Sequence, residues 1–295
     1  MKRALTLSLL FICLGSLTSC YALEWRKLHE EADRMDLTEA LAATEKKVDS
    51  IDNLYMLGLI YLNLHKDKEA GSTFEKILNL APQTIEAQWG LAEVLRRQHK
   101  ASDSERILNE VIKSRPDFYP AYITLAYLRY NEMKFEKSVE LALLVMKPGQ
   151  DKVDLSNYVR AVLLYAGNKG MIAHYGGPLS KVINGTVVLP NLKKAQSLQP
   201  DYAGVLFGLG SFYFLAPSLA GGDLDRAKVY LERAIKADPL FADAYVRLAQ
   251  VYKKKGDNNN YAYYLDKALG IDPQNELALD IKSGRCKYIC IAGQE

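Results

Sequence analysis

A period of 34 residues constrains the fold of this chain more than any other feature of its sequence. Counted from Ile51, the unit has small residues at positions 8 and 20, large side chains at positions 4, 7, 11 and 24, and proline at position 32. The first unit holds Leu54, Leu57, Gly58, Tyr61, Ala70, Phe74 and Pro82, and the second, from Ile85, holds Gln88, Leu91, Ala92, Leu95, Ser104, Leu108 and Pro116. Two antiparallel helices that approach closely at the small residues satisfy this pattern. The sequence therefore predicts stacked helical hairpins.

The period continues, with interruptions, beyond the first two units. A third unit follows directly, so the predicted repeats cover residues 51–152, and two more cover residues 203–275. Residues 153–202 form a degenerate unit that an insertion at 167–189 splits open. We expect residues 20–50 to contain a capping helical pair with a polar outer face, because the end of a repeat array needs one. Residues 276–295 are expected to form a final helix and a tail.

This pattern resembles the tetratricopeptide repeat (TPR). The resemblance implies an all-α solenoid, in which antiparallel helical pairs stack into a superhelix and the first helix of each pair lines the concave side. Family resemblance also places repeat positions 2, 5, 9, 12 and 13 toward that groove. The groove candidates are then Tyr55, Trp89, Glu93, Arg97, Tyr127, Tyr130, Asn131, Phe207 and Phe214. Exposed aromatic residues in such a row would indicate a partner or an apolar ligand, whereas the alternative is that some of them pack against neighbouring helices.

Two insertions fall within helical pairs. The insertion at 167–189 is rich in glycine and contains Asn184-Gly185 between runs of β-branched residues, which is a hairpin signal. It is interpreted either as a small β-hairpin or as an irregular surface loop, and its glycines would allow it to move as a lid over the groove. The second insertion ends at Asp223, which we expect to cap the helix that begins at Leu224.

The first 20 residues have the pattern of a targeting segment. A basic head, Lys2-Arg3, precedes an apolar run that is too short to span a membrane, and Leu17-Thr18-Ser19-Cys20 follows. The last four residues resemble the lipobox of bacterial lipoproteins, which implies a signal peptide over 1–19 and a lipid anchor on Cys20. The resemblance further implies an outer-membrane location facing the periplasm. The alternative is an ordinary secretory signal.

The remaining chemistry of the sequence is sparse. Cys286 and Cys290 are close enough in sequence to form a disulfide, and a redox or metal pair and two loose thiols are the alternatives. The net charge is only +3, of which Lys2 and Arg3 contribute two, so nucleic acid is not the expected partner. The sequence has no phosphate-binding loop, nucleophile elbow or paired metal-binding histidines. We therefore expect no enzyme activity, no metal and no cofactor.

Two non-enzymatic functions fit these features. The first is a TPR scaffold lipoprotein that binds an envelope protein or peptide in its concave groove. The second follows from the stretch Pro217 to Asp223, which is similar to an element of the T component of TRAP-associated transporters (TatT-like lipoproteins). That resemblance implies a groove that passes a hydrophobic solute to a periplasmic solute-binding protein. A closed apolar cavity beneath residues 167–189 would favour the transporter component, and an open groove with charged rims would favour the scaffold. The sequence leaves the oligomeric state open.

Overall fold

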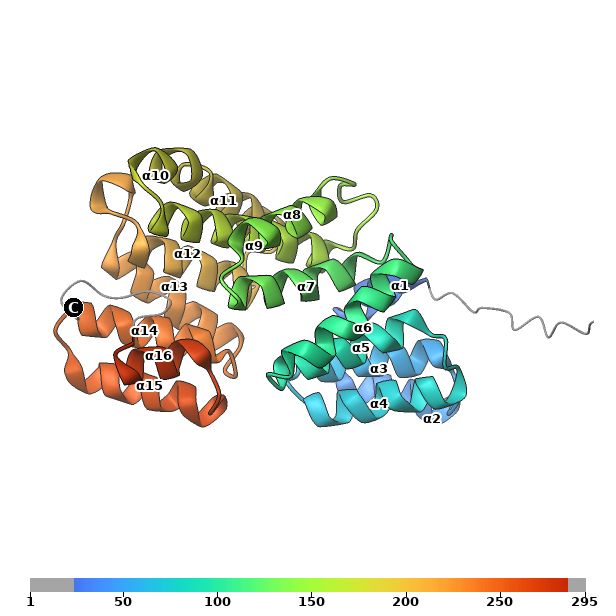
Figure 1. Cartoon of the computed structure of the whole chain (residues 1–295). Helices are drawn as coiled ribbons and strands as arrows, with labels where there is room; N and C mark the ends of the chain where they lie inside the picture. The colour runs from blue at the N-terminus through green and yellow to red at the C-terminus, as the bar shows by residue number, and fades with distance from the viewer. Residues whose placement is uncertain (1–23, 286–295) are drawn as a thin grey trace, which may run out of the picture.

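A computed structural model describes residues 24–285, and within that range it contains helices and no strand. The helices wind into a superhelix, so that the first and last hairpins lie below the middle of the chain (Figure 1). The predicted all-α solenoid is confirmed. The helices are α1 (Trp25–Ala32), α2 (Leu37–Lys46), α3 (Ile51–Asn63), α4 (Asp67–Leu80), α5 (Ile85–Arg97), α6 (Ala101–Ser114), α7 (Tyr119–Asn131), α8 (Phe135–Met146), α9 (Leu155–Tyr175), α10 (Pro178–Gly185), α11 (Val188–Leu198), α12 (Ala203–Leu215), α13 (Leu224–Ala237), α14 (Ala242–Lys254), α15 (Asn258–Ile271) and α16 (Glu276–Ser283), with a 3-10 turn at Ser218–Ala220.

The hairpins form where the repeat predicts them. Helices α3/α4, α5/α6, α7/α8, α12/α13 and α14/α15 pack as antiparallel pairs, and α9 pairs with α11 across the inserted segment. The small repeat positions are buried between the paired helices. In two hairpins the serine at position 20 donates a hydrogen bond to the carbonyl at position 8, from Ser104 to Ala92 over 2.7 Å and from Ser138 to Ala126 over 2.8 Å. Asp223 accepts hydrogen bonds from the backbone of the following helix, as predicted for its cap.

The insertion at 167–189 is helical, so the hairpin prediction is wrong. Helix α9 continues to Tyr175, and α10 then packs against it. Pro178 begins α10, where its missing N–H costs no helical hydrogen bond. Asn184, the expected turn residue, instead donates to the Ser180 carbonyl over 3.2 Å and accepts from the Lys169 ammonium over 2.9 Å. These local bonds stabilise a helical turn at Asn184-Gly185.

The first two helices do not form the predicted capping pair. Both pack on α3, while α1 makes no extensive contact with α2. Helix α2 covers the open end of the first repeat through the buried Ala40. Helix α1 turns the opposite way, into the interior of the superhelix. The physical reason is that Trp25, Leu28 and Ala32 find apolar surface there and join the core of the first repeats.

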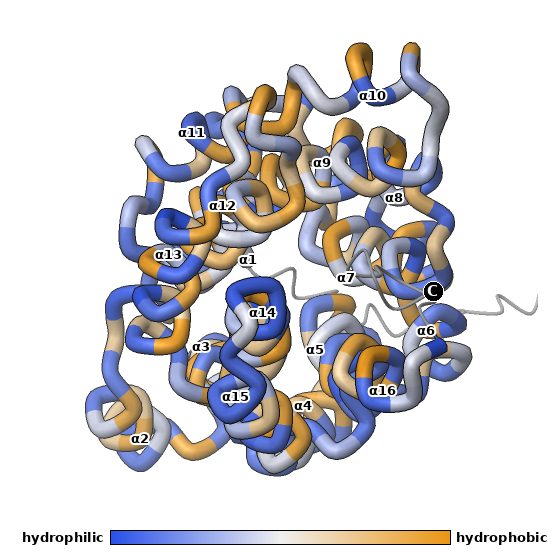
Figure 2. Tube along the Cα trace, turned by 90° about the vertical axis from the view of Figure 1, so that its left-hand side faces the viewer, coloured by the Kyte–Doolittle hydropathy of each residue, from blue (hydrophilic) through white to orange (hydrophobic). Residues whose placement is uncertain are grey.

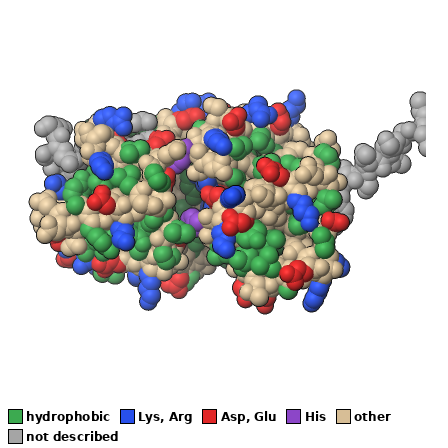
Figure 3. Space-filling view, turned by 90° about the horizontal axis from the view of Figure 1, so that it is seen from below, with side chains coloured by type: hydrophobic (Ala, Val, Ile, Leu, Met, Phe, Trp, Pro, Cys, Tyr) green, Lys and Arg blue, Asp and Glu red, His purple; other side chains and the backbone are tan. Residues whose placement is uncertain are grey.

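The superhelix closes on itself through two equivalent ion pairs. The imidazole Nε2 of His65 lies 2.9 Å from a carboxylate oxygen of Asp238, and that of His99 lies 3.2 Å from Asp272. Both histidines lie in the turn of their hairpins and have the left-handed backbone conformation, with φ of 56° and 59°. Burial alone would raise the pKa of Asp238, but the hydrogen bond and charge of His65 outweigh burial and lower that pKa. Figure 3 shows a hollow between the two halves of the molecule, flanked by histidine side chains.

Replacing both closing histidines, His65→Ala with His99→Ala, is expected to widen the superhelix. Helices α3–α6 do not pack extensively on α13–α16, and these two ion pairs join them across that seam. Partly exposed ion pairs contribute about 1 kcal/mol or less each, so the stability loss should be small. Small-angle scattering should report a larger radius of gyration, whereas His174→Ala, at an exposed histidine of α9, should leave it unchanged. An unaltered radius in the double variant would show that other contacts hold the seam.

Candidate functional site

The inner wall of the superhelix is the candidate site, and α1 occupies part of it. In Figure 2, α1 lies in the middle of the molecule, among α3, α5 and α7. The Trp25 ring makes edge contacts with Phe118 and Tyr119 at the start of α7, with ring centroids 5.4 and 6.3 Å apart. The His29 ring lies 5.8 Å from Tyr55 and 5.4 Å from Trp89. Helix α1 therefore contacts three successive repeats from inside.

This arrangement corrects the prediction of an exposed aromatic floor. Tyr55, Trp89 and Phe214 are only 0%, 3% and 4% exposed, so the alternative of packed rings is right for these three residues. The Tyr55 hydroxyl accepts a hydrogen bond from His29 over 2.9 Å, and burial raises its pKa well above the ordinary value. Trp89 donates through Nε1 to Thr124 over 3.0 Å. With α1 in place, these rings have no free surface through which to bind a partner.

The other predicted aromatic residues are half-buried. The Tyr127 ring lies 5.1 Å from the Arg96 guanidinium carbon, and burial raises its pKa to about 12. Tyr130 packs edge-on against Phe135, and Phe207 packs against Phe241 at 4.9 Å. Asn131, at the end of α7, is exposed. Roles for these residues in partner binding stay predictions. Cys20, Cys286 and Cys290 lie outside the described residues.

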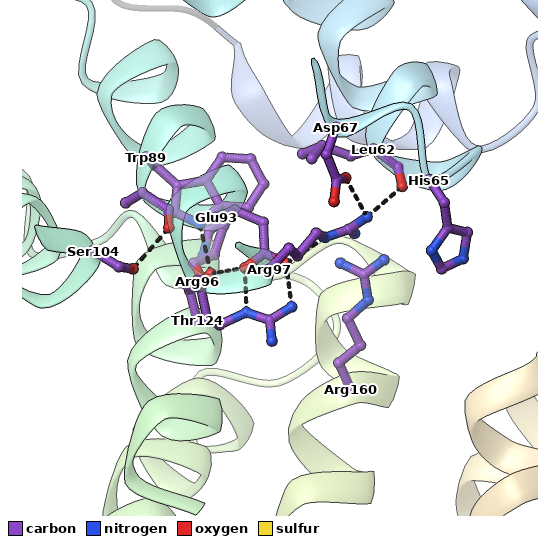
Figure 4. A network of polar contacts seen from close by, with 12 residues as sticks. Leu62, His65, Asp67, Trp89, Glu93, Arg96, Arg97, Ser104, Thr124 and Arg160 are labelled. Carbon is purple, nitrogen blue, oxygen red and sulfur yellow. Dashed lines mark hydrogen bonds and ion pairs between the residues drawn. The ribbon is translucent and has the colours of Figure 1, made fainter. Parts of the chain in front are cut away.

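A charged network runs along α5 on the inner wall (Figure 4). Glu93, 8% exposed, accepts hydrogen bonds from Arg96 Nε over 2.9 Å, Arg97 Nε over 3.0 Å and the Thr124 hydroxyl over 3.0 Å. Burial would raise the pKa of Glu93, but the charges and hydrogen bonds of the two arginines outweigh it and hold that pKa well below its usual range. Arg97 also donates to Asp67 over 3.1 Å and to the Leu62 carbonyl over 2.7 Å. These contacts fix the predicted residues Glu93 and Arg97 in place.

A pocket opens beside this network. It is small, with an interior volume of about 20 Å³, and residues from α1, α3, α5 and α9 line it. Arg160 of α9 reaches into it, and its guanidinium points toward Arg97 (Figure 4). Arg160 donates a hydrogen bond from Nε to the Tyr202 hydroxyl over 3.3 Å, and it forms no ion pair of 4.0 Å or less with residues 24–285. Nearby, the Oδ1 atom of the buried Asn157 has no hydrogen-bond partner. The pocket thus presents the N–H groups of Arg160 to a ligand.

Sequence reasoning missed His29, Asn157 and Arg160. His29 lies on the same face of α1 as the apolar residues Trp25, Leu28 and Ala32. Because α1 does not pair with α2, this apolar face could have indicated that α1 packs against other helices. Asn157 and Arg160 lie in the degenerate fourth unit, where the insertion obscures the repeat register. Within residues 24–285, no group of three or more His, Cys, Asp or Glu side chains could hold a metal. The same residues include no helix with the length and hydropathy of a membrane span.

Comparison with known proteins decides the repeat type. Tetratricopeptide-repeat family models match residues 51–84 and 218–276. These two segments match tetratricopeptide repeats, and the fold is a TPR-type solenoid. A similar relative is the human protein O-mannosyl-transferase TMTC3, which is 24% identical over 89% of this chain. The chain spans only 32% of the length of that relative, so its named activity does not carry over.

Solved TPR structures share the fold. The APC/C complex Cut9–Hcn1 superposes with a TM-score of 0.55 at 17% identity, over 87% of this chain and 47% of that chain. A TPR protein from Parabacteroides merdae gives 0.53 at 17% identity, over 88% and 97% of the two chains. Human IFIT1, solved with m7Gppp-AAAA, gives 0.58 at 17% identity, over 84% and 59%. At these identities, the likenesses show a common fold.

Proposed function

We propose that this TPR protein is a non-enzymatic scaffold that binds a protein or peptide partner at its inner wall. The observation that carries the proposal is the inner-wall pocket, where α5 supplies the fixed charges of Glu93 and Arg97, and α9 supplies Arg160, which forms no ion pair of 4.0 Å or less with residues 24–285. Arg97 and Glu93 are held by several hydrogen bonds each, so the wall is preorganised and a ligand need not order it. Arg160 offers N–H groups to an acceptor such as a peptide carbonyl or carboxylate.

We also propose that the protein acts at a bacterial envelope. A lipid would anchor it to the outer membrane, with the protein facing the periplasm. The support is the targeting pattern of residues 1–20 and the lipobox-like Leu17 to Cys20. A partner would then be another envelope protein or a peptide of that compartment.

The alternative proposal is a TatT-like component that hands a hydrophobic solute to a solute-binding protein. That function calls for an apolar cavity beneath residues 167–189. The lining of the inner-wall pocket instead includes Asp33, Glu93, Arg97 and Arg160, and no residue of 167–189. Helix α10 packs on α9, at the edge of the molecule in Figure 1, rather than over this pocket as a lid. These features support the scaffold.

The test is an envelope pull-down that compares Arg160→Glu with the parent chain. Reversing the charge should repel an acceptor-bearing partner and reduce its recovery about tenfold or more, since hydrogen bonds to charged groups contribute about 1.5–3 kcal/mol. Arg106→Glu is the matched control because Arg106 is an exposed arginine on the outer helix α6. Circular dichroism should show both variants folded. Equal recovery of the same proteins by both variants would refute a binding role for this wall.

A further inference from the structure

We propose that α1 is an internal ligand of the TPR groove, and that the external partner is an amphipathic helix which binds the inner wall in place of α1. This inference rests on the proposed scaffold function and names the class of partner. It follows from how α1 is bound, from what its removal would leave, and from which side chains it presents.

Helix α1 is held in the way that helical peptides are held in grooves. Its inward side chains Trp25, Leu28, His29 and Ala32 follow the spacing i, i+3, i+4 and i+7 and are all buried. Trp25 is a large aromatic anchor against Phe118 at one end. At the C-terminal end of α1, Asp33 accepts a hydrogen bond from the Ser156 hydroxyl over 2.5 Å. Helix α1 therefore bridges the first repeats and α9 without joining any hairpin.

The hairpins do not need α1 to complete their own packing. Helix α3 packs on α4 and α5 on α6, and α1 contributes no helix to these pairs. A repeat array is stabilised mainly by its hairpins and by contacts between neighbouring repeats. An isolated helix as short as α1, with eight residues, is also unstable on its own in water. Displacement of α1 by a partner helix would therefore exchange one occupant for another and leave the solenoid intact.

The seat of His29 defines the chemistry of the occupant. The Asn157 amide must point its NH₂ group toward Asp154, which it contacts at 2.9 Å, so it also donates to His29 Nδ1 over 3.1 Å. His29 Nε2–H then donates to the Tyr55 hydroxyl. Both bonds are satisfied by a neutral imidazole, since a proton on Nδ1 would face the Asn157 donor. The groove thus accepts an aromatic residue, an aliphatic residue three positions on, and a neutral hydrogen-bonding side chain at the next position.

The charged groups around this seat make the occupant sensitive to acid. Burial lowers the pKa of His29, while Asp154 and Asp33 raise it and Arg160 lowers it, with burial dominant. Tyr55 stays neutral because burial raises its pKa. Released α1 would have an ordinary histidine pKa of about 6.5, so protons bind preferentially to the released form. The contribution of His29 to the binding of α1 is therefore fully present above about pH 6.5 and decreases as the pH falls below that value.

The experiment measures binding of a fluorescein-labelled peptide, residues 24–36 of this chain, to the purified full-length protein by anisotropy. One receptor is the parent, and a second carries Trp25→Ala with Leu28→Ala, which removes the anchors of α1. A third has a protease site between Arg34 and Met35, so that cleavage frees α1 without changing a buried residue. Apparent affinity scales with the fraction of receptors whose groove is empty, so the second and third should bind the peptide about tenfold or more tightly than the parent.

Matched peptides make the result specific. The peptide with Trp25→Ala should bind the unseated receptors at least about tenfold more weakly, because hot-spot aromatic residues contribute about 2 kcal/mol or more. Binding should also weaken between pH 7.5 and 5.5. Equal affinity for all three receptors, or no binding to folded receptors with α1 unseated, would show that α1 is a fixed part of the core. If the pull-down still responded to Arg160→Glu, the scaffold function would stand while this inference failed.

Discussion

Replacing Phe74 with alanine is expected to lower the free energy of unfolding by about 3–5 kcal/mol, the usual loss for a fully buried phenylalanine. Phe74 of α4 is completely buried between two helices of neighbouring hairpins. A Cβ atom built on Gly58 of α3 or Gly90 of α5 would come within 2.5 or 2.6 Å of its ring. Because both positions are glycine, neither has a side chain that could fill the cavity that the ring would leave. Urea denaturation followed by circular dichroism measures the effect.

The control for this variant is Leu80→Ala in the same helix. Leu80 is 46% exposed, so its truncation should change the free energy of unfolding by no more than about 0.5 kcal/mol. A similar loss for the two variants would mean that the Phe74 ring does not fill the space between the first two repeats.

Glu93→Gln is expected to destabilise the protein by about 3–5 kcal/mol, because it removes the buried charge that two arginines share. The substitution keeps the shape of the side chain but leaves Arg96 and Arg97 with a neutral acceptor. The two arginines are each 20% exposed, so water compensates them only in part. The effect is measured by urea denaturation at pH 7. Glu31→Gln is the control, since its ion pair with Lys27 is exposed and should contribute less than about 1 kcal/mol.

The pH dependence of this difference provides a second readout. The pKa of Glu93 is lower in the folded chain than in the unfolded chain, where about 4.3 is usual. Its stabilisation is therefore fully present above about pH 5 and is lost as the pH falls through the folded-state pKa. The stability curves of the parent and Glu93→Gln should run parallel from pH 7 to about 5 and converge in stronger acid. A difference that stayed constant down to pH 2 would show that the carboxylate charge is not what stabilises the wall.

The hairpins could be predicted from the sequence because their contacts are local. Gly58 is a small position of the 34-residue pattern, and in the structure the Phe74 ring packs directly on it. The cap at Asp223 is equally local, since a side chain one residue before a helix can bond only to that first turn. The Asn184-Gly185 signal failed for the opposite reason. Packing of α10 on α9 and the bond from Lys169 to Asn184 override the turn preference of that dipeptide.

The inner wall could be predicted only in part. The repeat register predicted that Glu93 and Arg97 face the inner wall, and both line the pocket there, because repeat position determines which face of α5 they occupy. Their role in binding a partner stays a prediction. Whether Tyr55 and Trp89 are exposed depends on the path of α1, and that path is set by the curvature of the whole superhelix. Arg160 depends on the same curvature, because α9 must come round to face α5 before its guanidinium can approach Arg97.

The closing ion pairs have a consequence for how this protein unfolds. In an open repeat array, a terminal unit can fray alone because it touches only its neighbour. Here, loss of the first hairpin would also strip His65 from Asp238, and loss of the last would strip Asp272 from His99. Each end therefore restrains the other, and we expect amide exchange at the two termini to slow or quicken together. The two ends should therefore fray together to a greater extent than the ends of an open array do.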